Sequence, residues 1–307
     1  MGNPRWQGWR GFFHVGEMAK DTAHRDDQLS PAGLEALLRL LVTHDGSRVS
    51  SAIVDGRTVW IKRLGAGRGS LGKWMHAALR PLAPRDFLRS SPRLDGPGRA
   101  DREMRKTAAF RAAGFPAVDV LYRRGDLLVL SNAGTIVTSA LAGFREVDPA
   151  RHDALLVACA EALGRAHAAG LCHGRPHPRD MFIDGDEIGF LDFEEEPEAV
   201  MPLDAAQARD VWLLFHQIAS RAIAPDTSAR ALAAYRRAAP AQAVAQLRSL
   251  VRFFGAFLPM MRAAGSLAGR DGQRLLAGTS FLQSALTADG DSPQSLPVAG
   301  EIAKDGS

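Results

Sequence analysis

A short predicted hairpin inside an otherwise helical half constrains the fold of this chain more than any other feature. The segment LCHGRPHPRDMFIDGDEIGFLDFEEEP, residues 171–197, follows a stretch at 151–169 whose apolar spacing predicts a long helix. Within the segment, MFID and EIGFLDF predict two short strands that turn at Gly185-Asp186. Asp180 directly precedes this hairpin and Asp192 lies at the end of its second strand, so we expect the two carboxylates to converge.

Two carboxylates at facing ends of a hairpin form a candidate site for a divalent metal. Carboxylate oxygens are hard ligands, and Mg²⁺ is commonly held by one or two of them while water and nucleotide phosphates complete its shell. Asp180 and Asp192 are therefore the predicted metal ligands, in an arrangement suited to phosphoryl transfer. A lone Asp after a strand is most often a turn residue, so only the pairing across the hairpin favours a metal site.

The order of the other predicted elements indicates an α+β chain. The first half carries two hairpin signals, Asp55-Gly56 within 48–64 and Gly125-Asp126 within 116–131, and one helix is expected between them over 99–113. The second half is mostly helical, with further helices expected near 204–223, 227–237, 240–265 and 272–286. Strands first and helices later favour a β-rich lobe followed by a helical lobe.

The segment 171–197 resembles the catalytic loop and metal loop of the protein-kinase-like superfamily. It is most similar to the lipopolysaccharide-kinase and aminoglycoside-phosphotransferase branches, which carry His-Gly-Asp-x-x-x-x-Asn, a hairpin, and hydrophobic residues before Asp-Phe. The resemblance implies a bilobal protein-kinase-like fold, with a small β-rich N-lobe containing one main helix and a larger helical C-lobe. It implies four parts: an N-terminal extension at 1–40 with a helix near 31–42, an N-lobe at 41–131, a C-lobe at 132–286 and a disordered tail at 287–307.

The resemblance also implies a nucleotide site that uses ATP and Mg²⁺. Lys62, in TVWIKRL, matches the strand lysine that contacts the nucleotide phosphates, and Glu103, in RADREMRK, matches the helix glutamate that pairs with that lysine. LLVLSNAG, residues 127–134, resembles the strand and hinge that grip the adenine, and Asp210 matches the aspartate beneath the catalytic loop. The metal-binding positions of the family match the two hairpin carboxylates, Asp180 and Asp192.

The implied activity is a phosphotransferase reaction on a hydroxyl of a small-molecule, lipid or envelope-glycan acceptor. A protein Ser or Thr acceptor is disfavoured, because the chain after Asp192 shows no activation loop and no Ala-Pro-Glu anchor. ATP is the expected donor, and nucleotide and acceptor are the expected partners.

Three departures from the family pattern leave the activity open. Arg175 stands where the family has its catalytic Asp, Asp180 stands where it has the metal-binding Asn, and Glu194 replaces the glycine of the metal loop. Arginine is no general base at neutral pH, since its pKa exceeds about 12. Arg175 is therefore expected to neutralise the transferring phosphoryl group, with Asp180 or one of Glu194–Glu196 accepting the proton. The alternative is a pseudokinase that binds nucleotide as a regulatory module.

The scarcity of lysine helps to choose the phosphate-binding residue. The chain has 38 basic residues, but lysine occurs only at positions 20, 62, 73, 106 and 304, so a lysine between apolar neighbours is notable. Lys73 ends a P-loop lookalike, Gly67–Lys73, but Trp74 follows where a P-loop has Ser or Thr. This favours Lys62, although a solvent-facing strand lysine, a surface ion pair at Glu103 and a solvated loop at 194–198 are the plain alternatives.

The bulk composition narrows the class of protein only slightly. A formal net charge of +4 is small for 307 residues, so it permits contact with an anionic membrane surface and does not call for nucleic acid. The basic, aromatic start around Trp6 and Phe12 lacks a signal-peptide core, and no run is apolar enough to span a membrane. Two unpaired cysteines, Cys159 and Cys172, favour a reducing compartment. We expect a cytoplasmic protein, with peripheral contact at the inner membrane surface as an open alternative.

Overall fold

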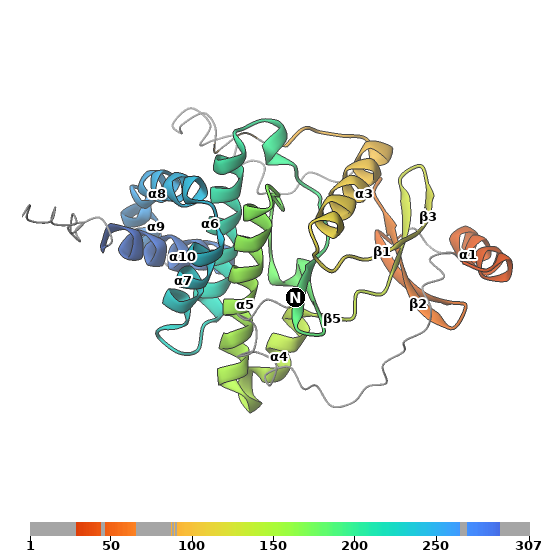
Figure 1. Cartoon of the computed structure of the whole chain (residues 1–307), viewed down its shortest axis with the longest axis horizontal. Coiled ribbons are helices and arrows are strands. Elements are labelled where there is room, and N and C mark those ends of the chain that lie inside the picture. Colours follow the sequence, from red (N-terminus) through yellow and green to blue (C-terminus); the bar gives the residue numbers. More distant parts are fainter. Residues whose placement is uncertain are drawn as a thin grey trace, which may run out of the picture.

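The computed structural model of the chain describes residues 29–43, 47–65, 87, 89, 91–264 and 269–288. These residues form two neighbouring lobes, a small one built on an antiparallel sheet and a larger one that is mostly helical (Figure 1). The expected α+β class, with a small β-rich lobe and a larger helical lobe, is confirmed. The expected extension before residue 29, the loop 67–73 with Lys73, and the tail from residue 289 lie outside the described residues.

The small lobe is a four-stranded antiparallel sheet in the order β1-β2-β4-β3. Its strands are β1 (Val49–Val54), β2 (Arg57–Arg63), β3 (Val120–Arg124) and β4 (Leu127–Ser131). β1 and β2 join at Asp55 and Gly56, whose φ angles of 52° and 71° are the positive pair that a type I′ turn requires. The turn fixes the register in which Val49 pairs with Lys62.

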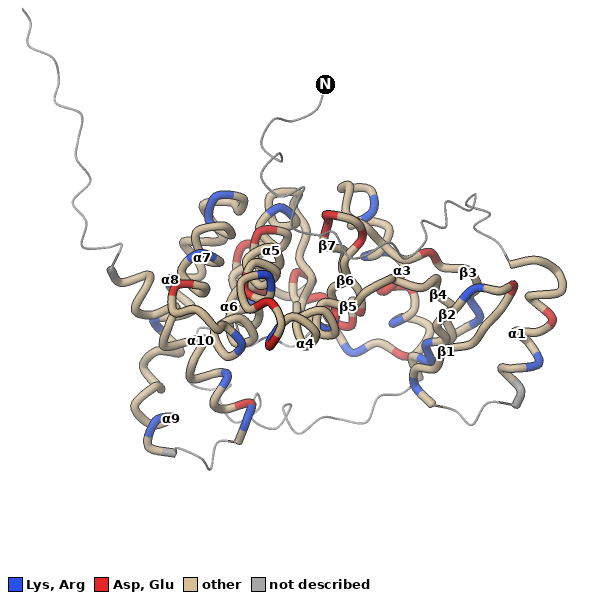
Figure 2. The backbone as a smooth tube through the Cα atoms, turned by 90° about the horizontal axis from the view of Figure 1, so that it is seen from below, with Lys and Arg blue, Asp and Glu red and all other residues tan. Residues whose placement is uncertain are grey.

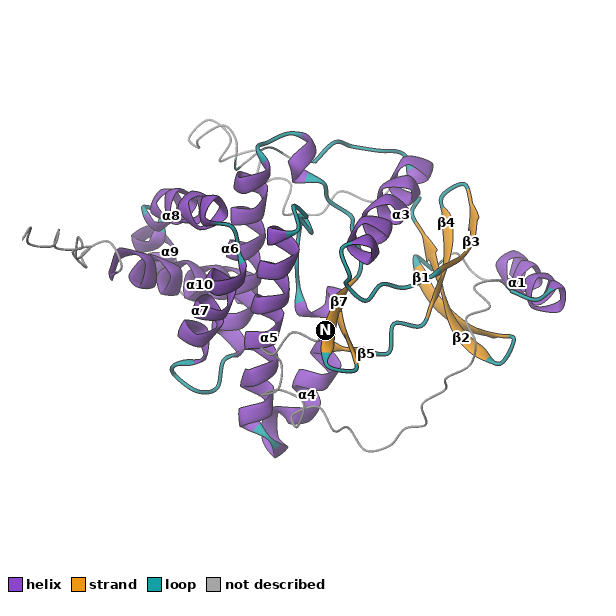
Figure 3. Ribbon diagram, in the orientation of Figure 1, coloured by secondary structure: helices purple, strands orange, loops and turns teal. Residues whose placement is uncertain are grey.

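One helix packs on each face of this sheet (Figure 3). The helices are α1 (Pro31–Thr43) and α3 (Gly96–Ala112). Leu37 of α1 packs with Ile61 of β2, whereas Ala100 of α3 packs with Leu128 of β4. Because successive strand residues point to opposite faces, Lys62 lies on the α3 face when Ile61 lies on the α1 face.

The larger lobe combines a three-stranded antiparallel sheet with seven described helices. The sheet has the order β5-β6-β7, with β5 (Thr135–Ile136), β6 (Met181–Asp184) and β7 (Glu187–Phe190). The helices are α4 (Val137–Val147), α5 (Pro149–Ala168), α6 (Leu203–Arg221), α7 (Thr227–Ala238), α8 (Ala241–Gly255), α9 (Leu258–Ala264) and α10 (Gly269–Ala288). Two short 3₁₀ turns, η2 (Pro178–Asp180) and η3 (Pro197–Ala199), flank the hairpin that β6 and β7 form.

Helix α5 lies at the centre of the larger lobe, packed against α4, α6 and α7. Leu155 and Leu163 of α5, Phe215 of α6 and Tyr235 of α7 are fully buried in one hydrophobic cluster. The same cluster includes Phe190 of β7. The β6–β7 hairpin therefore rests directly on the helical core, which fixes the residues at its ends.

Several elements differ from the sequence-based expectations, and three helices show how. Helix α4 was not expected, because its Ser, Thr, Gly and β-branched residues are weak helix formers, and it packs through buried Val137 and Leu141. The single helix expected over 240–265 is divided at 256–257 into α8 and α9. Helix α3 begins three residues before the expected position, at Gly96, because Asp95 caps it by accepting a hydrogen bond from the Gly98 amide.

None of the described helices combines the length and the apolar composition needed to cross a membrane.

Candidate active site

The centre of the candidate site is a lysine bonded to two carboxylates from different elements. Lys62 of β2 lies 2.9 Å, Nζ to Oε2, from Glu103 of α3, and it also donates to the carboxylate of Asp192, just after β7. The side chains of Lys62 and Glu103 are 8% and 5% exposed, so this is a buried ion pair rather than a surface one. The structure thus brings together three of the residues that the sequence singled out.

The ionisation of these three groups follows from their contacts. Burial alone would lower the pKa of Lys62, but the Glu103 and Asp192 carboxylates outweigh it and hold that pKa above its usual value. Burial raises the pKa of Glu103, with Lys62 opposing the rise. Burial would also raise the pKa of Asp192, yet Lys62 holds it below its usual value. Lys62 and Asp192 are therefore a firmly charged pair.

Asp180 lies beside Asp192 because the strands of the hairpin start and end together. The Leu191 amide donates to the Asp180 carbonyl at 2.8 Å, which ties the two carboxylate-bearing positions to each other. Asp192 has a φ of 62°, in the left-handed region that Asp tolerates better than most residues. This turn redirects the chain after β7 and places the Asp192 side chain on Lys62.

The pKa of the Asp180 carboxyl group is strongly perturbed by its surroundings. Burial raises its pKa to about 7, the charge of Asp192 adds to the rise, and Arg179 and Arg175 only partly oppose it. The nearest of these cations, Arg179, donates from Nε to the Asp180 carboxylate at 3.3 Å. Two mutually repelling carboxylates of this kind favour a cation between them.

The donor set fits Mg²⁺ only when other ligands come with the ion. Among the described residues, no group of three or more His, Cys, Asp or Glu side chains could hold a metal by itself. Two carboxylates, Asp180 and Asp192, are however what Mg²⁺ commonly takes from a protein when phosphate oxygens and water supply the rest. These residues therefore fit a nucleotide-borne Mg²⁺ rather than a structural metal.

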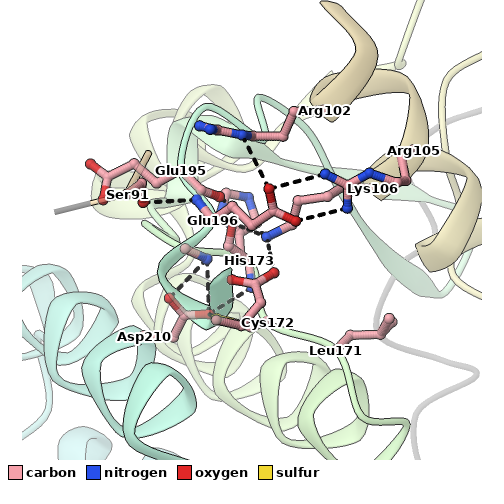
Figure 4. Close-up of polar contacts among 12 residues, drawn as sticks. Ser91, Arg102, Arg105, Lys106, Leu171, Cys172, His173, Glu195, Glu196 and Asp210 are labelled. Atoms are coloured by element: carbon pink, nitrogen blue, oxygen red, sulfur yellow. Dashed lines mark hydrogen bonds and ion pairs between the residues drawn. The ribbon is translucent and has the colours of Figure 1, made fainter. Parts of the chain in front are cut away.

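The loop from Cys172 to Asp180 is held in shape from below by Asp210 of α6. The carboxylate of Asp210 accepts from the amides of His173, at 2.7 Å, and Gly174, at 3.0 Å, and from the thiol of Cys172 at 3.3 Å (Figure 4). Despite full burial, which opposes it, hydrogen bonds from His167 and the loop amides keep the Asp210 pKa below its usual value. Asp210 is thus an ionised anchor for the loop.

His173 is a scaffold for the site and no proton carrier. Its Nε2 lies 2.9 Å from the carbonyl oxygen of Leu191, next to Asp192, so it links the loop to the end of the hairpin. Burial lowers the His173 pKa to about 4, and hence the ring is neutral at physiological pH.

The next residue, Gly174, has a φ of 103°, and a Cβ there would lie 2.4 Å from the Glu195 carbonyl oxygen. Only glycine fits this close approach.

Arg175 extends from the loop toward the segment after Asp192. Its guanidinium donates to the Glu194 carboxylate at 3.1 Å, and Arg48, at the start of β1, contacts the other oxygen of that carboxylate. The Arg175 side chain remains 42% exposed, so it can move toward a bound ligand. Arg175 of the loop is thereby paired with Glu194 of the segment that follows Asp192.

Sequence reasoning missed the basic residues of α3 that face the acidic segment, residues 194–198. Arg102, Arg105 and Lys106 all bond to this segment, and Figure 4 shows them converging on it from one side while Asp210 holds the loop from the other. Charged residues of both signs gather between α3 and the β5–β7 region (Figure 2). The available signal was the match between RADREMRK and EEEPE, but each run alone is typical of a solvated surface.

Trp60 lies on the same sheet face as Lys62, because the two positions are two residues apart in β2. Its indole Nε1 donates to the Asn132 side chain at 3.1 Å, within the residues 132–134 that connect β4 of the small lobe to β5 of the large lobe. Trp60 therefore ties the small lobe to the connecting segment.

Comparisons with known proteins give limited information. The chain matches no protein-family model. A curated relative, an uncharacterised protein of Haemophilus influenzae, is 25% identical over 160 residues, which make up 52% of this chain and 58% of the relative. The chain thus matches less than two thirds of the length of that relative.

Two solved kinases are among the structures similar to this chain. The Rio2 kinase of Chaetomium thermophilum, solved as an ADP/Mg²⁺-phosphoaspartate complex, is 19% identical, with 84% of this chain and 78% of that chain covered and a TM-score of 0.33. A MAP kinase of Leishmania major is 14% identical, with 88% and 93% covered and a TM-score of 0.33. Because both identities are below 25% and both TM-scores are 0.33, the fold of this chain is described from its own strands and helices.

Proposed function

We propose that this chain is an ATP- and Mg²⁺-dependent phosphotransferase of the protein-kinase-like type, acting on a hydroxyl of a small-molecule, lipid or envelope-glycan acceptor. The observation that carries the proposal is the Lys62 ammonium, which bonds to Glu103 on one side and Asp192 on the other. Such a lysine is held ready to contact phosphate oxygens, while its partner Asp192 and the adjacent Asp180 supply metal ligands.

Each residue has a distinct part in the proposed reaction. Lys62 binds and orients the phosphates of the nucleotide, and Glu103 fixes the position of Lys62. Asp180 and Asp192 hold Mg²⁺, which when bound neutralises charge that develops on the phosphoryl group. Arg175, half-exposed beside these carboxylates, adds positive charge where a transferring group would lie.

Asp180 is the favoured acceptor for the proton of the attacking hydroxyl. Glu195 is bonded to Arg209 and Glu196 to Arg105, so their carboxylates are already neutralised by partners. Asp180 also accepts from Arg179, at 3.3 Å, but this partner only partly offsets burial, which raises the Asp180 pKa to about 7 in the metal-free chain and suits a group that takes up a proton near neutrality. The sequence left Asp180 and Glu194–Glu196 as alternative proton acceptors, and the proposal selects Asp180 among them.

The proposal is tested by binding and by turnover. The purified protein is heated with ATP in the presence and absence of Mg²⁺, and γ-phosphate release or transfer is followed at the same concentrations. We expect ATP with Mg²⁺ to raise the Tm and to be consumed above background, and Asp192→Asn to lose both effects. Asp186→Asn, in the exposed turn of the same hairpin, is the matched control and keeps both. No shift and no turnover in the unmutated chain would overturn the proposal.

The second candidate function is a pseudokinase that binds nucleotide without transfer. The specific observation in its favour is the Arg175–Glu194 pair, which fills the position of the usual catalytic carboxylate with a cation bound to its own partner. A pseudokinase would show the Tm shift with ATP while turnover stays at background. The same experiment therefore separates the two functions.

A cytoplasmic location accords with either function, since ATP is available there. Cys159 and Cys172 are both free and buried, and burial raises the pKa of each thiol, as suits unreactive cysteines in a reducing compartment. Contact with the inner membrane surface is tested by co-sedimentation with anionic vesicles. Binding that falls steeply with salt would support it.

A further inference from the structure

Helix α3 carries two functional faces only one turn apart. Glu103 points to Lys62, and Lys106, three residues later, points to the loop and the acidic segment of the larger lobe. Residues three apart in a helix are neighbours on its surface. Any rotation or shift of α3 that moves Lys106 must therefore move Glu103 relative to Lys62 as well.

Lys106 is fully engaged in the larger lobe. Its ammonium donates to the carbonyl oxygen of His173 at 3.3 Å, to the carbonyl oxygen of Glu195 at 3.2 Å and to the carboxylate of Glu198 at 2.6 Å. An ammonium has three donors, so each has an acceptor, and the Lys106 side chain is 5% exposed. These three acceptors together fix the position of the buried Lys106 ammonium.

Two arginines of the same helix repeat this attachment. Both terminal nitrogens of Arg105 donate hydrogen bonds to the Glu196 carboxylate, at 2.7 and 3.0 Å. Nε of Arg102 lies 3.5 Å from the same carboxylate. Arg102 also donates to the backbone carbonyls of Glu194, at 2.6 Å, and Pro92, at 2.9 Å. The acidic segment is therefore the docking surface of α3 rather than a solvated loop.

The loop that Lys106 reaches is the one that carries Asp180. The His173 carbonyl accepts from Lys106, while the amide of the same residue donates to Asp210 of α6. The His173 peptide region is thus held from two opposite directions, by α3 and by α6 (Figure 4). This is the point at which the small lobe and the catalytic loop are joined.

We infer that Lys106 is a positioning residue that sets helix α3 against the loop 172–180, so that Glu103 meets Lys62 before any nucleotide arrives. The inference rests on the proposed role of Lys62 as the phosphate-binding lysine. It assigns Lys106 no contact with substrate; Lys106 acts on the site through α3 and through its bonds to His173, Glu195 and Glu198. The pair of Lys62 and Glu103 is consequently assembled in the nucleotide-free chain, and Lys106→Met loosens it.

A first experiment tests the attachment without nucleotide. Hydrogen exchange is measured for the unmutated chain and for Lys106→Met, with Arg111→Met as the matched control, because Arg111 is a cation at the far end of α3 that bonds to Ala117, Val118 and Asp119 instead. We expect faster exchange at 99–106 and 172–176 in Lys106→Met alone, with α5 unchanged. Unchanged exchange at 99–106 would overturn the inference, whatever the protein does with ATP.

A second experiment separates positioning from general stabilisation. ATP affinity is measured for Lys106→Met, Glu103→Gln and the double variant. If Lys106 acts through Glu103, each single variant loses affinity by about tenfold and the double variant loses no more than the worse single one. Multiplying losses would show that Lys106 acts independently of Glu103, and an unchanged affinity in a folded Lys106→Met would refute the role.

A milder variant covers the case in which Lys106→Met does not fold. Glu198→Gln keeps Lys106 and its two carbonyl acceptors and removes one charge from a half-buried position, so it is expected to fold and to show a smaller change of the same kind in both experiments. If the unmutated chain binds no ATP, the proposed function fails, while the exchange experiment still decides whether Lys106 fixes α3.

Discussion

The guanidinium of Arg175 donates to the carboxylate of Glu194 across 3.1 Å, and these are two of the residues at which the sequence departs from the kinase-like pattern that it resembles. One departure puts a cation in place of a carboxylate, and the other puts a carboxylate in place of a glycine. The two changes therefore offset each other in charge and sit in contact.

The first prediction concerns Arg175 itself. If its charge stabilises the transferring phosphoryl group, Arg175→Ala lowers the transfer rate by ~100-fold, the usual effect of removing one such donor, and leaves ATP affinity nearly unchanged. Arg124→Ala, at the exposed end of β3, is the control and keeps the rate. Single-turnover transfer and ATP titration measure the two quantities. An unaltered rate in Arg175→Ala would leave Arg175 with only its Glu194 contact.

The second prediction separates the stability of the buried ion pair from its function. Lys62→Met strands the Glu103 carboxylate in a site where it is 4% exposed, and breaking a buried pair in this way costs about 3–5 kcal/mol. Lys62→Met combined with Glu103→Leu removes the more buried of the two carboxylates that lose Lys62, so urea unfolding should show part of the stability restored. Neither variant should transfer phosphate. A double variant as unstable as the single one would contradict this account.

Local patterns were enough to predict the positions of the hairpins and the closeness of Asp180 to Asp192. The turn pairs Asp55-Gly56 and Gly185-Asp186 specify tight turns by their own conformational preferences, and the distance along the chain from Asp180 to Asp192 is one hairpin. Each of these features is determined by residues close in sequence. For that reason these features can be predicted from the sequence alone.

The attachment of α3 to the larger lobe could not be predicted from local sequence patterns, for a physical reason. Lys106 meets Glu198 across 92 positions of sequence and His173 across 67, and both runs look like ordinary solvated charge until the lobes are placed together. Helix α4 was missed for a related reason, since its weak helix formers are held in a helix by the burial of Val137 and Leu141. In both cases tertiary contact overrides the local signal.

The third prediction is a pH effect of Asp180 in metal-free protein. The Asp180 pKa, 3.8 for a free side chain, is raised to about 7 in the folded chain by burial and then by Asp192. The stabilisation from the bound proton is complete below the unfolded pKa and is lost as the pH rises through about 7. Asp180→Asn avoids the loss, so at pH 8 in EDTA its Tm should exceed that of the unmutated chain.

The size and the control of this effect follow from the same linkage. Even one pKa unit is worth about 1.4 kcal/mol, which corresponds to roughly 3–6 °C in a domain of 150–250 residues. The gain should shrink toward pH 5, where Asp180 is protonated in the folded chain. Asp184→Asn, on an exposed carboxylate four residues later, is the control and should shift little. A Tm difference that is equal at pH 5 and pH 8 would assign the effect to something other than Asp180 ionisation.

The fourth prediction tests the close approach of the loop to the acidic segment. Gly174 has a φ of 103°, and its missing Cβ would lie 2.4 Å from the Glu195 carbonyl oxygen, whereas Gly170, with a φ of 76°, has open space around its Cβ position. Both alanine variants carry the cost of a positive φ, about 1–3 kcal/mol. Only Gly174→Ala also pushes the loop away from Glu195, so it alone should reduce ATP-dependent stabilisation. If thermal melts show Gly170→Ala and Gly174→Ala to be equally stable and equally responsive to ATP with Mg²⁺, the packing of the loop against the acidic segment does not shape the site.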